Sequence, residues 1–396
     1  MADKKLNQQF KITGTLSDLY DSTDIDISNM ISSVAVKKDF NTDIMPLFVV
    51  YLKTDYDLHE RIRKHEVQLA LNIEEFDVEE DIDDLVMYEP ASSVITFSGM
   101  LKIFDKNIQE LDIKQDNDNP EVNQVESTQF YNITLSCIPE KIYNQNSKII
   151  NAVYGNATLT EIVVDILDTE QNKVYIDRSD NTNREETLLI PPLNVSNAIQ
   201  YLHQNYGLYN SSYKLFFDFE RIYLIKTFND KADAHKLIVN VVSQNEISDS
   251  SIYNNIILND DGNLVKTLPT HPIIVSHEDV TSNLLGGNAI IGSYGEDYEL
   301  ITRSYNNDPN ETKVRYYWNP GRSERFETMH NTVPKQYSTI VLENVSPNYI
   351  DILTKVEINS AKTEINGSFD IQSIRQVFGT SDYKLYSGTT LISIAK

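Results

Sequence analysis

The chain has 396 residues, 40% of them hydrophobic, which is enough for the cores of two or three domains. Its 59 acidic residues outnumber its 34 basic ones, and the resulting formal charge of −25 disfavours tight binding to the phosphates of nucleic acid. No run of eighteen apolar residues occurs and the N-terminal residues have no apolar core, so we expect neither a membrane anchor nor a secretory signal.

The acidic excess allows two interpretations. It keeps a protein soluble, and it would also let DNA pass through a conduit without adhering to the wall. Composition alone favours the first interpretation, because many soluble proteins carry such a charge without any conduit.

The first 150 residues are predicted to be mainly strands. Residues 67–73 alternate apolar and polar side chains with a period of two, and residues 131–137 do the same. The second run contains the single cysteine, Cys137, which we interpret as a small buried apolar side chain because no metal-binding neighbours accompany it. The acidic stretch 74–84 lies between strand signals and is predicted to be a solvated loop.

Two helices are predicted in the middle of the chain. Thr158 and Glu161 form a capping box, and a helical stripe of apolar residues follows it. The second helix begins near Asn194 or Ser196, either of which can cap it. Gly207 is well placed to end this helix, because glycine readily adopts the left-handed conformation of a C-terminal cap.

An aromatic segment follows the second helix. Residues 206–226, YGLYNSSYKLFFDFERIYLIK, are predicted to form a hairpin with strands over 213–219 and 222–228, which completes a small α+β unit. One strand face is expected to pack on the helix that carries Ile199 and Leu202, while Phe216 points toward another domain or another chain. The face expected on the helix comprises Tyr213, Leu215, Phe217 and Phe219.

Core packing is the first interpretation of these rings. A subunit contact on the second face is an alternative, and a platform for stacking nucleic-acid bases is another, although no groove rich in Lys and Arg accompanies the rings. The candidate packing or interface residues are Tyr213, Phe216, Phe217, Phe219 and Tyr223.

Residues 231–396 return to strand patterns. The glycine-rich stretch 286–295 lacks the strand-to-helix context of a phosphate-binding loop and is predicted to be an ordinary loop. Three strand-like runs end the chain, at 351–360, 367–378 and 383–395, with small turns between them. They indicate a barrel or sandwich that is closed by its C-terminal strands.

A search for chemical motifs assigns no active site. No metalloprotease, hydrolase, paired-cysteine or nucleotide-binding motif occurs. His59 and His65 are each followed by Glu, but this charged run is more typical of a solvated helix turn than of a metal site. Trp318 could stack a sugar, although packing at a surface or interface is the simpler interpretation. We therefore expect no catalytic residue, no cofactor, no metal site and no enzymatic activity.

One family resemblance emerges from these segments. Residues 155–228, with a helix ending at a Tyr-Gly turn and an aromatic hairpin that carries Asp218, resemble the central segment of baseplate hub proteins from contractile-tailed bacteriophages. The closing run at 367–396 is similar to the last strands of the second tube-like barrel in that family.

The resemblance implies a fold. It implies a mainly β (α+β) protein in which two tube-like β-barrel domains flank a small α+β domain. The expected domains are an N-terminal barrel over 1–148, a middle α+β domain over 149–232, and a second barrel with loop insertions over 233–396.

The resemblance also implies a function. Hub proteins of this kind are structural virion proteins that form a homotrimer and adapt the sixfold tail tube to the threefold central spike. The expected partners are the tail tube protein, the central spike protein and baseplate wedge proteins, with transient, non-adhesive passage of DNA through the ejection channel. The expected location is the virion tail baseplate, assembled in the host cytoplasm. Another baseplate or tail-fibre attachment component is the alternative, and a cell-wall-degrading tail enzyme is a more distant one.

Overall fold

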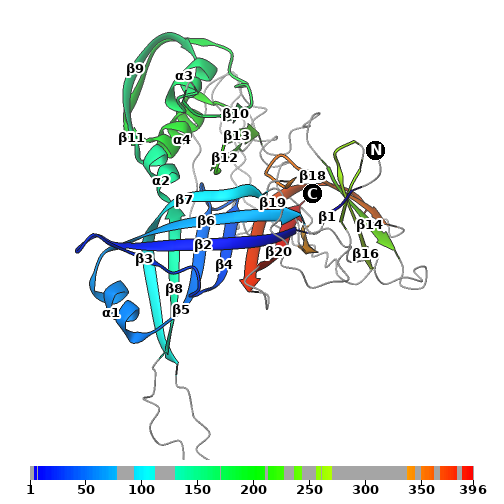
Figure 1. The fold of residues 1–396 in the computed structure, drawn as a ribbon. Helices are drawn as coiled ribbons and strands as arrows, with labels where there is room; N and C mark the ends of the chain where they lie inside the picture. The colour runs from blue at the N-terminus through cyan, green and yellow to red at the C-terminus, as the bar shows by residue number, and fades with distance from the viewer. Residues whose placement is uncertain are drawn as a thin grey trace, which may run out of the picture.

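The computed structural model describes residues 4–6, 8–77, 93–111, 130–169, 171–209, 213–226, 236–242, 256–259, 261–269, 337–343, 349–360, 366–380 and 386–395. Over these residues the chain is mainly β, as predicted (Figure 1). The helices are α1 (Tyr56–Lys64), α2 (Glu140–Ser147), α3 (Leu159–Ile166) and α4 (Val195–Tyr206).

The strands are numbered in chain order. Those of the N-terminal part are β1 (Lys4–Leu6), β2 (Gln8–Asp18), β3 (Thr23–Asp26), β4 (Ile31–Asp39), β5 (Leu47–Thr54), β6 (Val67–Asp77), β7 (Ser93–Leu111) and β8 (Phe130–Pro139). Those of the middle part are β9 (Ile149–Thr158), β10 (Val174–Ile176), β11 (Arg184–Asn194), β12 (Tyr213–Phe217) and β13 (Ile222–Lys226). The remaining strands are β14 (Lys236–Val242), β15 (Ile256–Leu258), β16 (Leu264–Pro269), β17 (Tyr337–Glu343), β18 (Lys355–Ser360), β19 (Gly367–Thr380) and β20 (Tyr386–Ala395).

Eight strands form a closed ring. Their hydrogen-bonded order is β19-β4-β5-β8-β7-β6-β2-β20, and β20 pairs with β19 to complete the circuit. All of these pairings are antiparallel. Closing a sheet on itself removes the exposed edges that would otherwise pair with other chains. We call this ring the barrel.

The barrel joins the two ends of the chain. Residues 1–148 supply six of its strands, whereas β19 and β20 come from the C-terminal segment that was expected to form a separate second barrel. The remaining C-terminal strands β14, β15, β16, β17 and β18, together with β1, extend the same sheet beyond β19 and β20. Within the described residues these extra strands form no second closed ring, and the predicted domain boundaries remain a prediction.

The inside of the barrel is an apolar core. Alternate residues of its strands point inward, as the period of two predicts, and Cys137 is among them with no exposed surface. Burial raises the pKa of the Cys137 thiol to about 12, so this side chain stays a neutral apolar residue. At the seam between β2 and β20, Gly388 leaves room for the ring of Phe10.

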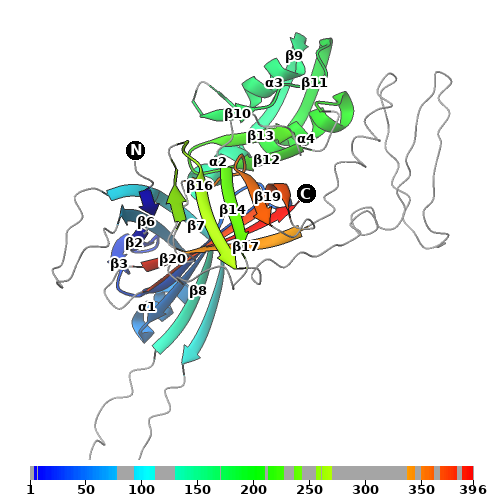
Figure 2. The same ribbon diagram turned by 90° about the vertical axis from the view of Figure 1, so that its right-hand side faces the viewer.

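The middle part forms a separate core between two small sheets and three helices. Strands β9 and β11 pair with each other, and β10, β13 and β12 form a second sheet. The predicted capping box of Thr158 and Glu161 is present at α3, and Asn194 caps α4 with its side chain. Gly207 ends α4 in the left-handed conformation with φ 65°, as expected. Figure 2 shows this part standing to one side of the barrel.

The acidic stretch 74–84 is not wholly a loop, because Glu74 to Asp77 continue β6 and pair with β2. The rest of that stretch, the glycine-rich residues 286–295 and Trp318 lie outside the described residues.

Among the helices that the structure describes, none has the length and apolar character to cross a membrane.

The seam gives a first testable prediction. A Cβ atom on Gly388 would lie 2.6 Å from Cε2 of Phe10, closer than packed atoms approach. We expect Gly388→Ala to lower the free energy of unfolding by about 1–3 kcal/mol, the usual cost of overpacking a core. Gly379→Ala, where a Cβ atom meets nothing within 4 Å, serves as the matched control in urea unfolding. Equal losses in the two variants would contradict this account of the seam.

Candidate functional site

The aromatic hairpin β12–β13 lies where the middle part meets the rest of the chain. The two strands are antiparallel, with Leu215 opposite Leu224 and Phe216 opposite Tyr223. One face of the hairpin belongs to the core of the middle part, where Leu215 and Phe217 join Ile199 and Leu202 of α4. Leu215 and Phe217 therefore share a core with helix α4, the second helix predicted from the sequence.

The opposite face of the hairpin belongs to a different core. Phe216, Tyr223 and Ile225 pack with residues of β14, β18 and β19. The ring of Phe216 meets that of Phe40 edge to face, with centroids 4.7 Å apart. Phe216 is fully buried and Tyr223 is 6% exposed, so neither ring is open to a partner chain or to a nucleic-acid base. The contact is with another part of the same chain.

The remaining predicted aromatic residues lie at the two ends of β12. Tyr213 faces His203 of α4, with ring centroids 4.7 Å apart, and burial raises its pKa to about 12. Phe219, just beyond the strand, contacts the barrel residues Phe97 and Phe48 with centroids 5.0 and 5.5 Å away. The hairpin and its tip therefore touch each of the three apolar cores that the described residues form.

A buried ion pair fixes the tip of the hairpin. The Lys38 ammonium of β4 lies 2.8 Å from a carboxylate oxygen of Asp218, and the two side chains are only 6% and 10% exposed. The same ammonium lies 4.5 Å from the centroid of the Phe219 ring, a cation–π contact. The backbone N–H of Phe219 donates to the Asp218 carboxylate at 2.8 Å, so the charge is satisfied from both sides.

Two further polar contacts tie the hairpin to the C-terminal strands. Lys214 Nζ donates to the carbonyl of Ile371 at 3.3 Å and to the Gln372 side chain at 3.2 Å. Tyr223 donates its hydroxyl hydrogen to Asp351 at 3.2 Å. Burial and then the Asp351 charge raise the pKa of Tyr223, so this hydroxyl remains a donor. The arrangement holds parts of the chain together and brings no pair of reactive groups to a cleft.

Sequence reasoning identified Asp218 but missed its partner. Lys38 is 180 residues away, in a strand segment with no local feature that distinguishes it from other lysines. Lys214 likewise looks like a solvent-facing residue in an alternating strand, yet it is 8% exposed. No local signal could have found either residue, because both are defined by strands that meet only in the folded chain.

The two clustered histidines have different partners. His59 stacks on Tyr131 with centroids 4.0 Å apart, whereas His65, just beyond α1, places Nδ1 2.5 Å from the Asp18 carboxylate. In the part of the chain that the structure describes, no three His, Cys, Asp or Glu residues gather as metal ligands would.

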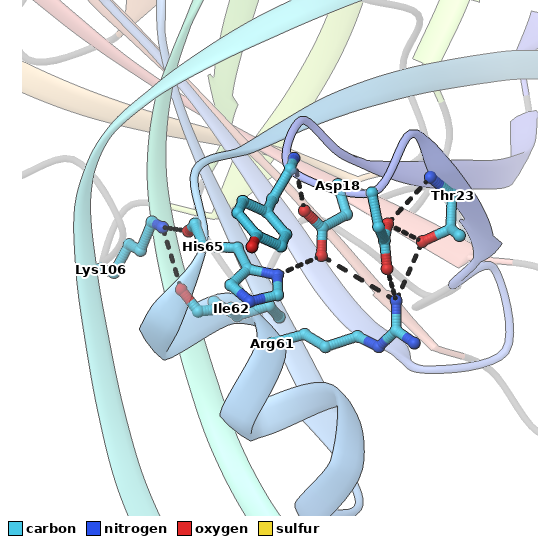
Figure 3. A network of polar contacts seen from close by, with 8 residues as sticks. Asp18, Thr23, Arg61, Ile62, His65 and Lys106 are labelled. Atoms are coloured by element: carbon cyan, nitrogen blue, oxygen red, sulfur yellow. Dashed lines mark hydrogen bonds and ion pairs between the residues drawn. The ribbon is translucent and has the colours of Figure 1, made fainter.

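His65 and Asp18 belong to a polar network at one end of the barrel (Figure 3). Arg61 of α1 donates to Thr23 at 2.9 Å and approaches Asp18 at 3.9 Å. Lys106 Nζ donates to the carbonyls of Ile62 and His65 at 3.0 and 3.1 Å, at the C-terminal end of α1, where a cation is favourable. The hydrogen bond to His65 is the main cause of the lowered pKa of Asp18.

Comparison with solved structures shows what kind of protein has this fold. The tail protein from Neisseria meningitidis MC58 is 10% identical with a TM-score of 0.51, and the match covers 98% of this chain and 97% of that one. The 43 kDa tail protein of prophage MuSo2 from Shewanella oneidensis is 9% identical with a TM-score of 0.45, covering 97% and 96%. The first of these likenesses shows the fold of a tail protein over nearly the whole chain.

The family follows from the sequence model. Residues 6–393 match the family described as Bacteriophage PBS1 gene 109 protein, and the chain belongs to that family. Among curated proteins no relative matches the chain. The resemblance to bacteriophage baseplate proteins predicted from sequence is confirmed, and the findings support a structural protein of the phage tail or baseplate.

The buried ion pair gives a second prediction. Asp218→Ala leaves the Lys38 ammonium buried without its counter-charge, so we expect a loss of about 3–5 kcal/mol in the free energy of unfolding. The double variant Lys38→Met, Asp218→Leu should recover most of this loss because no charge remains buried. Urea unfolding measures both variants.

The control for this prediction lies next to Lys38. Lys37 pairs with Asp39 and Asp43 while its side chain is 44% exposed. Lys37→Met should therefore cost less than about 1 kcal/mol. If Asp218→Ala cost no more than Lys37→Met, the ion pair could not be an important tie between the hairpin and the barrel.

The polar network gives a third prediction, on pH. Because the folded-state pKa of Asp18 is depressed, its contribution to stability is present above its unfolded pKa of about 4 and is lost as the pH falls through the folded value. We expect Asp18→Asn to be clearly less stable than the wild type at pH 7, with the difference shrinking below about pH 4. Urea unfolding at a series of pH values tests this, and a difference independent of pH would contradict it.

Proposed function

We propose that this chain is a baseplate hub protein. In this proposal it forms a homotrimer that adapts the sixfold tail tube to the threefold central spike and lines part of the DNA ejection channel. Its partners are then the tail tube protein, the central spike protein and baseplate wedge proteins, and it joins the baseplate of the virion after assembly in the host cytoplasm.

The observation that carries the proposal is the fold over the whole chain. Its likeness to a tail protein spans 98% of this chain and 97% of that one. The aromatic hairpin supports the same role, because it binds the β-rich parts to the middle part through three apolar cores. A channel or adaptor component must transmit force between neighbours without coming apart, and a chain tied in this way suits that demand.

The charge of the chain supports passage of DNA. With 59 acidic and 34 basic residues, the chain repels the phosphate backbone at long range. A wall of this charge lowers the adhesion of DNA during ejection, whereas a nucleic-acid-binding protein would need clustered Lys and Arg.

The mass of the purified chain tests the proposal. We expect three copies of the 45.4 kDa chain in native mass spectrometry, either alone or with the central spike protein. A strict monomer under both conditions would contradict the adaptor role.

Peptidoglycan incubated with the protein should release no soluble fragments, and a cleared substrate would instead favour a cell-wall-degrading tail enzyme.

A further inference from the structure

An exposed tyrosine stands at one end of the barrel. Residues 18–24 comprise the connection between β2 and β3 and the strand ends beside it, and in this turn Leu19 is 47% exposed and Tyr20 is 84% exposed. A large aromatic side chain at such a tip contributes little to the fold of its own chain, whereas buried Tyr side chains dominate the energetics of many interfaces. We call residues 18–24 the Tyr20 turn.

The Tyr20 turn is held in one conformation. The Asp18 carboxylate accepts a hydrogen bond from the backbone N–H of Tyr20 at 2.9 Å, and the Tyr20 ring lies 5.1 Å from the ring of His65. The backbone N–H of Leu19 donates to the carbonyl of Glu66 at 3.0 Å. Figure 3 shows the same Asp18 and His65 connected through Arg61 to Thr23. A preorganised tip of this kind loses little entropy on binding.

A pocket lies elsewhere on the same chain. Its volume is about 460 Å³, within the range of ligand-binding pockets, and it opens between α2, the end of α3 and the aromatic hairpin. Leu167, Phe217 and Ile222 contribute to its apolar floor. Its rim is polar and includes Lys141 and Lys148, together with amide side chains. We call it the α2 pocket.

The charges of the two features are complementary. The Tyr20 turn and the adjoining β3 carry the exposed carboxylates of Asp24 and Asp26, and also that of Asp21, which pairs with Arg61 of the same chain at 3.1 Å. The rim of the α2 pocket carries two lysines and one carboxylate, Asp168, which lies 3.6 Å from Lys148. Two copies of a chain with charge −25 repel each other over most of their surfaces. At the lysines of the pocket rim, an acidic surface of a second copy is attracted instead.

One copy cannot fill its own pocket. The Tyr20 turn lies beside His65, which directly follows α1, and His59 of α1 stacks on Tyr131 near the start of β8. Helix α2, which lines the pocket, begins directly after Pro139 at the other end of β8. A strand rises about 3.3 Å per residue, so these two ends are roughly 25 Å apart. The hydrogen bonds that hold the Tyr20 turn also prevent it from reaching across that distance.

We propose that Tyr20 of one copy inserts into the α2 pocket of the next copy. The contact is head to tail, because the turn and the pocket are different surfaces. A head-to-tail contact closes a ring of three when each copy is rotated by a third of a turn from the one before it, and forms an open filament when the rotation does not close. This inference rests on the proposed function, whose homotrimer is such a ring, and assigns the two surfaces that build it. The aspartates of the turn then face Lys141 and Lys148 of the neighbouring copy.

Engineered cysteines test the contact directly. We expect the variant Tyr20→Cys, Asn144→Cys, with Asn144 on the pocket rim, to form covalent species up to a trimer under mild oxidation. Each single variant should stay uncross-linked, because Cys137 is buried with a raised pKa and does not compete. The pair Tyr20→Cys, Thr187→Cys, whose second position is exposed on β11, is the control. Cross-linking that stops at a dimer, or that is equal in the control pair, would overturn the proposal.

Substitutions at each surface supply an independent measurement. Tyr20→Ser and the double variant Lys141→Glu, Lys148→Glu should each weaken trimer formation at least roughly tenfold, as expected for the loss of a central interface residue. Lys11→Glu, Lys53→Glu makes the same change in charge at exposed barrel positions and should leave the trimer intact. Native mass spectrometry over a dilution series gives the fraction of trimer, and circular dichroism checks that each variant is folded.

The outcomes separate this inference from the proposed function. A wild-type chain that is monomeric alone and with the spike protein contradicts both. A wild-type trimer that survives the Tyr20 and lysine substitutions, and in which the cysteine pair forms no cross-link, contradicts the Tyr20 contact and leaves the hub role standing.

Discussion

A two-stranded hairpin with apolar side chains on both faces must have both faces covered, since each exposed ring would leave a large apolar area in water. In this chain the constraint falls on β12 and β13. The middle part covers one face and the C-terminal strands cover the other, while Phe219 reaches the barrel at the tip. The position of the middle part therefore follows from the burial of this hairpin, and the Lys38–Asp218 ion pair fixes the tip in register.

The closing strands impose a second constraint. Because β19 and β20 are hydrogen-bonded to β4 and β2 as well as to β18 and β17, the barrel cannot close until the end of the chain is present. In the described residues the strands of the two β-rich parts therefore belong to one continuous sheet. Pairing between strands so far apart in sequence is slow to form, yet it leaves no barrel edge open to other chains.

These two constraints suit a component of a tail assembly. Membership of a bacteriophage protein family and a tail-protein fold place the chain in that setting. A chain whose parts share strands and whose middle part is anchored in three cores offers neighbours a rigid set of surfaces. The exposed Tyr20 turn and the α2 pocket are surfaces that such a rigid body can present in fixed positions.

Local sequence signals predicted the local structure well. The capping box at Thr158, the cap at Asn194, the left-handed Gly207 and the alternation around Cys137 depend on residues within a few positions of one another, so the sequence by itself determined them. The aromatic hairpin and the resemblance to phage baseplate proteins also came from contiguous residues. Tertiary structure alone decided that β19 and β20 complete the barrel and that Lys38 meets Asp218. The pairing of β19 with β4 and the contact between Lys38 and Asp218 join residues that are far apart in the sequence. A periodic pattern predicts which face of a strand is apolar, but it does not predict which strand or helix covers that face.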